Sequence, residues 1–456
     1  LTGSGERIEN GNLLLSGGRI EVVGAEPIEA PEGTRVIDAD GRWVTPGLID
    51  VHSHLGVYPS PGIKAHSDGN EATDPVTAAV WAEHSVWPQD PGFSRALAGG
   101  VTSLMVLPGS ANLIGGRGVT LKNVPATSYQ AMKFPGAPHS LKMACGENPK
   151  RVYGGKGRAP STRMGNVARY RAAWIEARDY LDKQKAAQSN GKNRKGDEKS
   201  EAPTRDLRLE TLAGVLEGEI LVHMHCYRAD EMMTILDMAD EFGYRVTAFH
   251  HGVEAYKIAD ELAANGVCGA LWADWWGFKM EAYDGIQENI ALVDRPAGGC
   301  AIVHSDSPEG IQRLNQEATK AMARGNRAGL EIPEERAIAW ITANPARAMG
   351  ILDQTGTLEG IDDHDHELSE MLTRAGRGQG RLRGLRRRDR HPTAGGATDC
   401  HALHRLQNLG RDPRKADELR PSAPVIDQAG APPVLPSRPS SWVTAGVSPP
   451  LPPVHC

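Results

Sequence analysis

The chain has 456 residues, which is too long for a single small core and long enough for one large α/β domain with a smaller companion. Its formal net charge of −6 argues against nucleic acid or an anionic membrane as the main partner, so a small-molecule substrate is expected. No stretch of about 18 apolar residues predicts a membrane span. The six cysteines form no CxxC pair, which predicts neither a disulfide framework nor a thiolate zinc site.

Residues 1–46 predict a small β lobe. Short apolar runs alternate there with turn residues, and Gly17-Gly18 is typical of a hairpin turn. Because the chain begins inside this pattern, we expect the lobe to be incomplete and a preceding strand or export signal to be missing. The compartment is therefore left open: the cytoplasm is the default, and export is the alternative.

Residues 47–352 predict an α/β domain, since strand-like apolar runs alternate with amphipathic segments of helical length. Seven or eight such units imply a closed (β/α)8 barrel of the TIM type. An open doubly wound sheet is the alternative, but no GxGxxG motif follows the first strand. The strand-like runs are 48–55, 100–109, 140–148, 219–226, 245–252, 266–274 and 300–306.

Two segments depart from this pattern. Residues 183–206 are polar and charged, which predicts a mobile surface insertion in the barrel. Residues 353–456 form an atypical tail that becomes rich in arginine and proline, and we expect it to be disordered. An RNA-binding role for this basic tail is the weaker interpretation, because few aromatic residues accompany its arginines.

Potential metal ligands stand at the ends of several strand-like runs. His52 and His54 are two residues apart in a strand, so they share one face. A buried, hydrogen-bonded pair is the ordinary interpretation of an isolated His-x-His, but the carboxyl ends of barrel strands meet at one mouth. Imidazoles combined with a carboxylate suit zinc or a similar divalent ion. The other candidates at this mouth are Lys142, His225, His251 and Asp306.

Three more histidines accompany these candidates. His223 shares a face with His225 one pleat deeper, and we expect it in the core or in support of a ligand. His250 is expected to point away from His251, so only one of the two is a ligand; a glycine ends the strand beside His251 and favours it. His304 is predicted to orient a ligand or to bind substrate.

These residues and their surroundings resemble the amidohydrolase superfamily, in particular its imidazolonepropionase-like and Xaa-Pro dipeptidase-like branch. The matching segments lie between about residues 8 and 359 and include PGLIDVHSHLG, AGGVTSLMVLPGS, VHMHCYRADEM, FHHGVEAYKIADELAANGV, VHSDSPEGIQRLNQEA and TANPARAMGI. The resemblance implies a metal-dependent barrel with an N-terminal β-sandwich lobe. It implies metal ligands at His52, His54, His225, His251 and Asp306.

The resemblance leaves the number of metal ions open. In two-metal members a lysine on the fourth strand is carboxylated and bridges the ions, and Lys142 lies where that strand is expected. Burial beside two cations would lower the pKa of its amine, as carboxylation requires. Two zinc ions are expected if Lys142 is carboxylated, and one ion otherwise.

The resemblance also implies a reaction: hydrolysis of a C–N bond in an amide, peptide or cyclic amide. A metal-activated water would attack, with Asp306 as general base and then general acid. Tyr227 and Arg228 are predicted to hold a substrate carboxylate, although Arg228 could instead pair with Asp230 or Glu231. A single-metal deaminase and a non-catalytic protein are the alternatives. Whether the protein forms a homo-oligomer is left open.

Three further features of the sequence concern the surroundings of the site and the end of the domain. The glycine-rich stretch 108–118 is expected to be a loop facing the mouth. Trp272, Trp275 and Trp276 are candidates for an apolar wall, with ordinary aromatic packing as the alternative. After residue 359 the chain leaves the pattern of the relatives, whose next strands complete the β lobe, and we expect an aberrant, out-of-frame continuation.

Overall fold

The computed structural model describes residues 1–193 and 202–359. Residues 194–201 and 360–456 lie outside the described part, and so does the arginine- and proline-rich stretch of the predicted tail. The chain divides into two units, and the first, Leu1–Gly376, holds every element described below.

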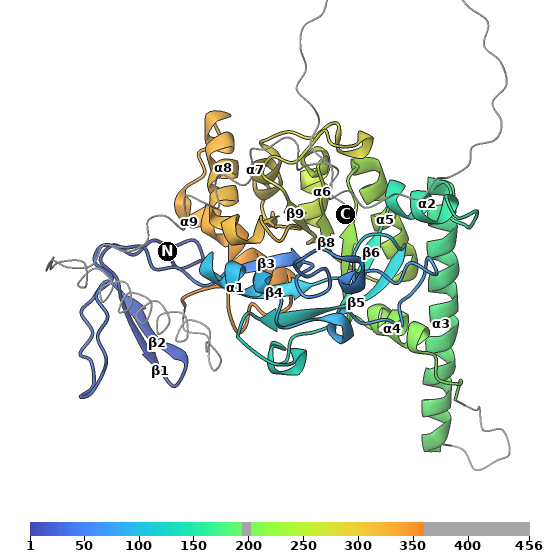
Figure 1. Cartoon of the computed structure of the whole chain (residues 1–456), viewed down its shortest axis with the longest axis horizontal. Helices are drawn as coiled ribbons and strands as arrows, with labels where there is room; N and C mark the ends of the chain where they lie inside the picture. Colours follow the sequence, from blue (N-terminus) through green and yellow to red (C-terminus); the bar gives the residue numbers. More distant parts are fainter. Residues whose placement is uncertain (194–201, 360–456) are drawn as a thin grey trace, which may run out of the picture. The chain divides into compact units, whose positions relative to one another are not determined.

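Within residues 1–193 and 202–359, ten strands form two sheets. Figure 1 shows how they are arranged. The first sheet is an N-terminal hairpin and the second has eight strands in chain order, curved into a nearly closed barrel. The strands are β1 (Asn12–Ser16), β2 (Arg19–Gly24), β3 (Leu48–Ser53), β4 (Val101–Val106), β5 (Ile114–Lys122), β6 (Ser140–Ala144), β7 (Leu221–His225), β8 (Val246–His250), β9 (Cys268–Leu271) and β10 (Ala301–Val303).

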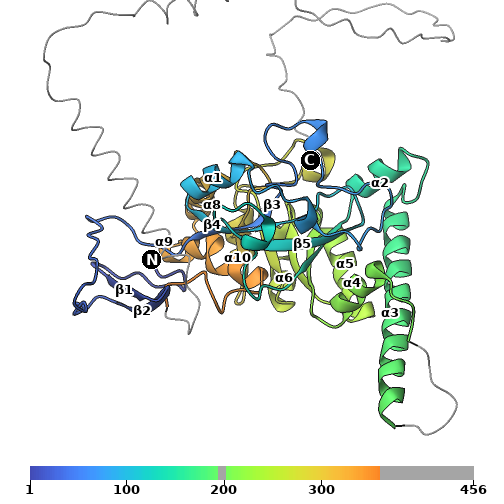
Figure 2. The same cartoon turned by 60° about the horizontal axis from the view of Figure 1, so that its bottom comes forward.

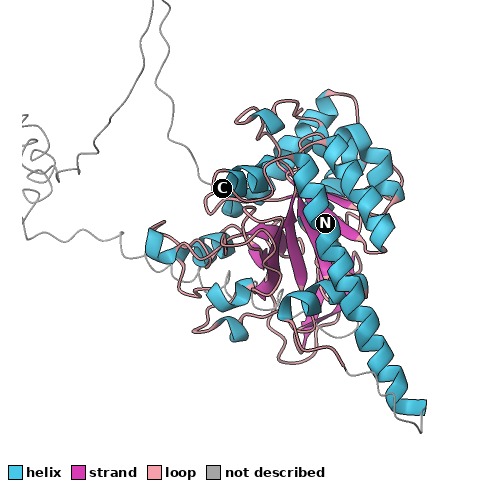
Figure 3. Ribbon diagram, turned by 90° about the vertical axis from the view of Figure 1, so that its right-hand side faces the viewer, coloured by secondary structure: helices cyan, strands magenta, loops and turns pink. Residues whose placement is uncertain are grey.

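Helices lie outside the barrel strands, which occupy the centre in Figure 3. In the described part of the chain, no helix is long and apolar enough to cross a bilayer. The helices are α1 (Pro91–Ala98), α2 (Glu147–Gly154), α3 (Arg163–Asn193), α4 (Leu207–Leu216), α5 (Ala229–Phe242), α6 (Ala259–Ala264), α7 (Asn289–Asp294), α8 (Leu314–Arg327), α9 (Glu334–Ala337) and α10 (Ala343–Ala348), with short 3-10 helices η1 (Lys64–His66), η2 (Ala82–Ser85), η3 (Tyr129–Ala131), η4 (Ala255–Ile258), η5 (Met280–Ala282), η6 (Ile311–Arg313) and η7 (Ile338–Ile341).

The N-terminal hairpin is confirmed. β1 and β2 pair antiparallel, and Ser16 faces Arg19 across the two-residue turn predicted at Gly17-Gly18. Both glycines have positive φ, as a turn of type I′ requires. Ile20 of this hairpin packs with Leu358, so the last described residues return to the N-terminal sheet.

One barrel strand runs against the expectation of an all-parallel sheet. β5 pairs antiparallel with both β4 and β6, so the sheet is mixed. The stretch 108–118 was predicted to be a loop. This prediction was wrong for residues 114–118, which form the first part of β5. Close packing requires two of its glycines, Gly116 and Gly118: Gly116 has a φ of 123°, and a Cβ on it would lie 2.4 Å from the Val80 carbonyl oxygen.

Helix α5 illustrates how the barrel is covered. Met232, Ile235, Ala239 and Phe242 are buried, at the three- and four-residue spacing that predicted this helix. The helix ends at Gly243, whose φ of 71° provides the left-handed cap. Full burial of such a side chain contributes about 1.5–3 kcal/mol, so this face holds α5 on the sheet.

Helix α3 runs into the segment that was predicted to be a mobile insertion. It starts before the expected insertion 183–206 and continues into it as far as Asn193. Figure 2 shows its second half extending away from the barrel. Helix α4 then begins just after Asp206, whose carboxylate accepts hydrogen bonds from the amides of Arg208 and Leu209.

Hydrogen bonds close the barrel between its first and last strands. Beyond β10, the Ser305 hydroxyl donates to the carboxylate of Asp50 in β3, and the Ser305 amide donates to the same group at 3.2 Å. The amide of Asp306 donates to the carbonyl oxygen of His52 at 3.1 Å. These contacts bring Asp306 to the His-x-His end of β3.

In the described part of the chain, two disulfides join the ends of neighbouring strands, so the prediction of no disulfide framework was wrong. Cys145 and Cys226 follow β6 and β7 directly, and their Cα atoms lie 5.2 Å apart. Cys268 opens β9 and Cys300 precedes β10, with Cα atoms 4.6 Å apart. The sequence did not indicate these pairs, because the partners are 81 and 32 residues apart in the chain. They become neighbours only through the register of the parallel strands.

Candidate metal centre

Three side chains at the mouth of the barrel direct their ligand atoms toward one another. His52 Nε2 lies 3.3 Å from His54 Nε2 and 3.4 Å from Asp306 Oδ1. The distance between His54 Nε2 and Asp306 Oδ1 is 3.1 Å. His52 is fully buried, and the side chains of His54 and Asp306 are 19% and 6% exposed.

These separations fit a single divalent ion. In a tetrahedral zinc site with bonds of about 2.0–2.1 Å, neighbouring ligand atoms lie about 3.3 Å apart. His54 is also oriented for this role, because its Nδ1 donates to the Leu107 carbonyl oxygen at 2.8 Å and leaves the Nε2 lone pair toward the site. The donor set therefore suits zinc or a similar ion.

The backbone is strained at two of the predicted ligands. His251 has a φ of 64° and Asp306 a φ of 49°, in the left-handed region that disfavours residues with a side chain. At His251 this conformation breaks the alternation of strand β8. The rings of His250 and His251 both approach His52, with ring centroids 4.8 and 4.6 Å away. The expectation that these two histidines point in opposite directions was wrong.

His225 and Lys142 lie beside this group. The His225 ring is buried 4.8 Å from that of His251, and its Nδ1 has no hydrogen-bond partner among the described residues. A buried nitrogen without a partner suits a metal ligand. Lys142 in β6 is fully buried, and its Nζ donates to the Pro108 carbonyl oxygen at 3.0 Å.

Burial controls the charge of the histidines. It lowers the pKa of His52, His225 and His251 well below the usual value of about 6.5, and neighbouring positive groups lower it further. Each imidazole is therefore neutral at neutral pH, which is the form that binds a metal.

The predicted substrate contacts differ in their surroundings. Tyr227 is buried, and its ring is 5.7 Å from that of His251. Arg228 donates to both carboxylate oxygens of Asp230 at 2.9 and 2.8 Å, which is the alternative that the sequence left open. His304 Nε2 lies 2.9 Å from His251 Nδ1, a position from which it can orient that ring.

An aromatic wall stands next to the histidines. Trp272 stacks on His251 with centroids 4.4 Å apart, and Trp275 stacks on Trp272 at 5.2 Å. These rings and Trp276 line a small pocket beside His251. Sequence reasoning missed Lys279, whose Nζ lies 3.9 Å from the centre of the Tyr227 ring. A lysine in an irregular loop carries no periodicity that would reveal it.

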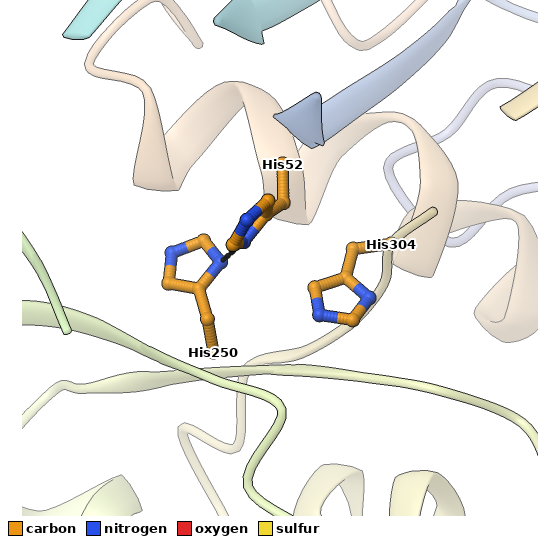
Figure 4. Close-up of side chains that lie close together, drawn as sticks. All are labelled: His52, His250 and His304. Atoms are coloured by element: carbon orange, nitrogen blue, oxygen red, sulfur yellow. Dashed lines mark hydrogen bonds between the residues drawn. The ribbon is translucent and has the colours of Figure 1, made fainter. Parts of the chain in front are cut away.

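A second histidine group includes His250, which the sequence did not place in the site. His52, His250 and His304 are buried and face one another (Figure 4). The Nδ1 atoms of His52 and His250 are 2.8 Å apart. That separation is typical of a hydrogen bond and shorter than the roughly 3.3 Å between two ligands of one zinc ion.

No family model matches the chain, but it is similar to known proteins, among them two amidohydrolases. It is 35% identical to the crystal structure of an amidohydrolase from Thermotoga maritima MSB8, with a TM-score of 0.64 over 77% of this chain and 87% of that one. It is 32% identical over 378 residues to the amidohydrolase tasK of Hapsidospora irregularis, covering 78% of this chain. A stretch of 103 residues is 32% identical to a 5-methylthioadenosine/S-adenosylhomocysteine deaminase of Bacillus cereus (strain AH187). The chain spans only 37% and 22% of the length of these two curated relatives.

Proposed function

The chain belongs to the amidohydrolase superfamily, and from that premise we propose that it is a metal-dependent hydrolase of carbon–nitrogen bonds in small molecules. One observation carries the proposal: two imidazole nitrogens and a carboxylate oxygen lie 3.1–3.4 Å apart at the mouth of the barrel. This spacing fits a divalent ion, and the family resemblance implies these same three residues as ligands.

We propose that His52, His54 and Asp306 hold one ion. His225 and His251 serve a second ion if Lys142 is carboxylated. When bound, such an ion lowers the pKa of water to about 7 and polarises a scissile carbonyl group.

The carboxylate of Asp306 is proposed as the group that moves the proton. Its backbone amide is fixed by the hydrogen bond to His52, and its Oδ2 lies 3.8 Å from His251 Nε2. A carboxylate held at this point can take a proton from the attacking water and return it to the leaving nitrogen.

The substrate side of the site is proposed to be formed by Tyr227, His304 and the tryptophan wall. The stacked rings favour a flat or apolar group on the substrate. Arg228 would bind a substrate carboxylate only by giving up its two hydrogen bonds to Asp230. Lys279 is a second cation on this side of the site: its Nζ lies 3.9 Å from the centre of the Tyr227 ring, and that ring lies 4.9 Å from the His225 ring.

Metal analysis and a substrate screen test the proposal. Purified protein should contain one or two divalent ions per chain and should hydrolyse a member of a set of acyl-amino acids, dipeptides and cyclic ureides. Protein that binds no divalent ion after incubation with zinc, and hydrolyses none of these compounds, would be the inactive alternative.

A single-metal deaminase is the second candidate. The observation that favours it is the Nζ of Lys142, which as a free amine already donates to the Pro108 carbonyl oxygen at 3.0 Å. One ion per chain together with ammonia release from amino-purines supports the deaminase. Two ions together with amide cleavage support the first proposal.

A further inference from the structure

Three buried histidines and one carbonyl group form a continuous chain of hydrogen bonds behind the candidate metal centre. His52 Nδ1 lies 2.8 Å from His250 Nδ1, and His250 Nε2 lies 2.8 Å from His223 Nδ1. His223 Nε2 in turn lies 3.1 Å from the carbonyl oxygen of Ala348. All three rings are fully buried.

The last member of the chain gives it a direction. Ala348 lies in the last turn of α10, where carbonyl groups lack amide partners within the helix. A carbonyl oxygen can only accept a hydrogen bond, so the proton of His223 must be on Nε2. The Nδ1 atom of a neutral His223 then accepts from His250 Nε2.

The direction of the hydrogen bonds extends from His223 to the candidate metal centre. With its proton on Nε2, His250 accepts at Nδ1, and the donor is His52 Nδ1. His52 therefore keeps the lone pair on Nε2, the atom that faces His54 and Asp306. The opposite direction would set two acceptors against each other at Ala348.

The surroundings of His223 and His250 keep both rings neutral. Among the described residues, no carboxylate lies within ion-pair distance of His223 or His250. A charged imidazole that is fully buried without a counter-ion is strongly disfavoured.

We propose that His250 and His223 are positioning residues that fix the tautomer of His52, so that its Nε2 is ready to bind a metal ion. This inference rests on the proposed metal centre and deepens it. It also explains why the sequence contains adjacent histidines at positions 250 and 251: one serves the site directly, and the other holds a ligand from behind.

The tautomers are directly measurable in metal-free protein. Two-bond 15N–1H correlation spectra of histidine-labelled protein distinguish Nδ1–H from Nε2–H rings, and single substitutions assign the signals. We expect His52 to be Nδ1–H, and His223 and His250 to be Nε2–H. A spectrum with His52 in the Nε2–H form would overturn the inference whatever the enzyme does.

Metal affinity gives a second readout. His250→Leu removes the acceptor for His52 Nδ1 and should weaken zinc binding by about 10–100-fold in a competition with a chelator. His250→Gln can accept from His52 and donate to His223, so it should restore most of the affinity. His139→Leu, a histidine packed against Trp81, is the matched control and should leave zinc binding unchanged.

The outcomes separate the two proposals. If wild-type protein binds no zinc, the metal-dependent function fails, while the tautomer measurement still decides the inference. If wild-type protein binds zinc and His250→Leu binds it equally well, the positioning role fails and the proposed function stands. If His250→Leu does not fold, His250→Gln and the spectra of the wild type still test the hydrogen-bond direction.

Discussion

Asp306 joins the two ends of the barrel sheet at the candidate metal centre, and its backbone is left-handed at a φ of 49°. Such strain persists where surrounding contacts impose it, here the amide hydrogen bond to His52. An asparagine would keep the shape of the side chain and an oxygen near His54. It would lose the ability to take up and return a proton.

We therefore expect Asp306→Asn to fold and to retain part of its metal, while kcat falls by about 10²–10⁴-fold. Steady-state kinetics with metal analysis of the same sample measures both quantities. Asp240→Asn on the exposed surface of α5 is the matched control and should behave as wild type. Turnover close to wild type in Asp306→Asn would refute the proton-transfer role.

The lowered pKa of His223 should make the stability of the metal-free protein depend on pH. Burial lowers the pKa of His223 to about 3, whereas an unfolded chain has a histidine pKa of about 6.5. Between these values the unfolded chain binds a proton that the folded chain does not, so the free energy of unfolding falls as pH falls. The full effect of this one group is roughly 5 kcal/mol at about 1.4 kcal/mol per pKa unit.

Urea unfolding of metal-free protein at several pH values below 6.5 tests this expectation. His223→Gln keeps an acceptor and a donor but does not titrate, so its stability should decline less steeply with acid than that of the wild type. Equal slopes for the two proteins would contradict the assignment of the lowered pKa to His223.

The sequence predicted much of the site at the level of single residues, and strand geometry explains why. His52, His54 and Asp306 were identified because barrel strands deliver their last residues to one mouth. The approach of both His250 and His251 to His52 was not predictable, because it depends on the positive φ of His251, which breaks the alternation of the strand. Lys279 reaches the site from a loop, where sequence spacing carries no geometric information.

At the scale of elements, strands rich in branched apolar residues were identified from sequence and β5 was not. In β6 to β8 the apolar character is strong because these strands are buried from both sides. β5 contains three glycines, which lower its strand propensity, and packing around Gly116 and Gly118 leaves no room for a side chain. β5 forms a strand because it pairs with β4 and β6, and the local sequence does not reveal that pairing.

The two disulfides are also features of paired elements. The bridge between Cys268 and Cys300 spans 32 residues and should restrict the unfolded chain by about 3–4 kcal/mol. We expect the Cys268→Ala/Cys300→Ala variant to be less stable by that amount in urea. Reductant should destabilise the wild type more than this variant.

A thiol count checks the same prediction independently. In denaturant without reductant, Cys145, Cys226, Cys268 and Cys300 should resist alkylation, and mass mapping identifies which cysteines react. Alkylation of all four under these conditions would show that the bridges do not form.

At the scale of the whole molecule, a closed barrel was predicted, but its mixed sheet and the contacts that close it were not. Alternating strands and helices indicate a barrel, but the antiparallel β5 and the seam between β3 and β10 follow from tertiary contacts. That seam carries Asp50, Ser305 and Asp306, and the proposed metal ligands stand on both sides of it. Closure of the fold and assembly of the site thus depend on the same few contacts.

This arrangement predicts that metal removal acts locally on the seam. Zinc at about 100 times its Kd would stabilise the folded chain by about 2.7 kcal/mol, and the ligands on β3 and beyond β10 would share that gain. Hydrogen exchange followed by mass spectrometry should show residues 48–55 and 300–306 exchanging faster after chelation, because local opening there becomes easier. The hairpin β1–β2 contains none of the proposed ligands, so it should exchange at the same rate with and without metal. Uniformly faster exchange along the described chain would mean that the ion supports the entire fold, and unchanged exchange at the seam would mean that it does not bind there.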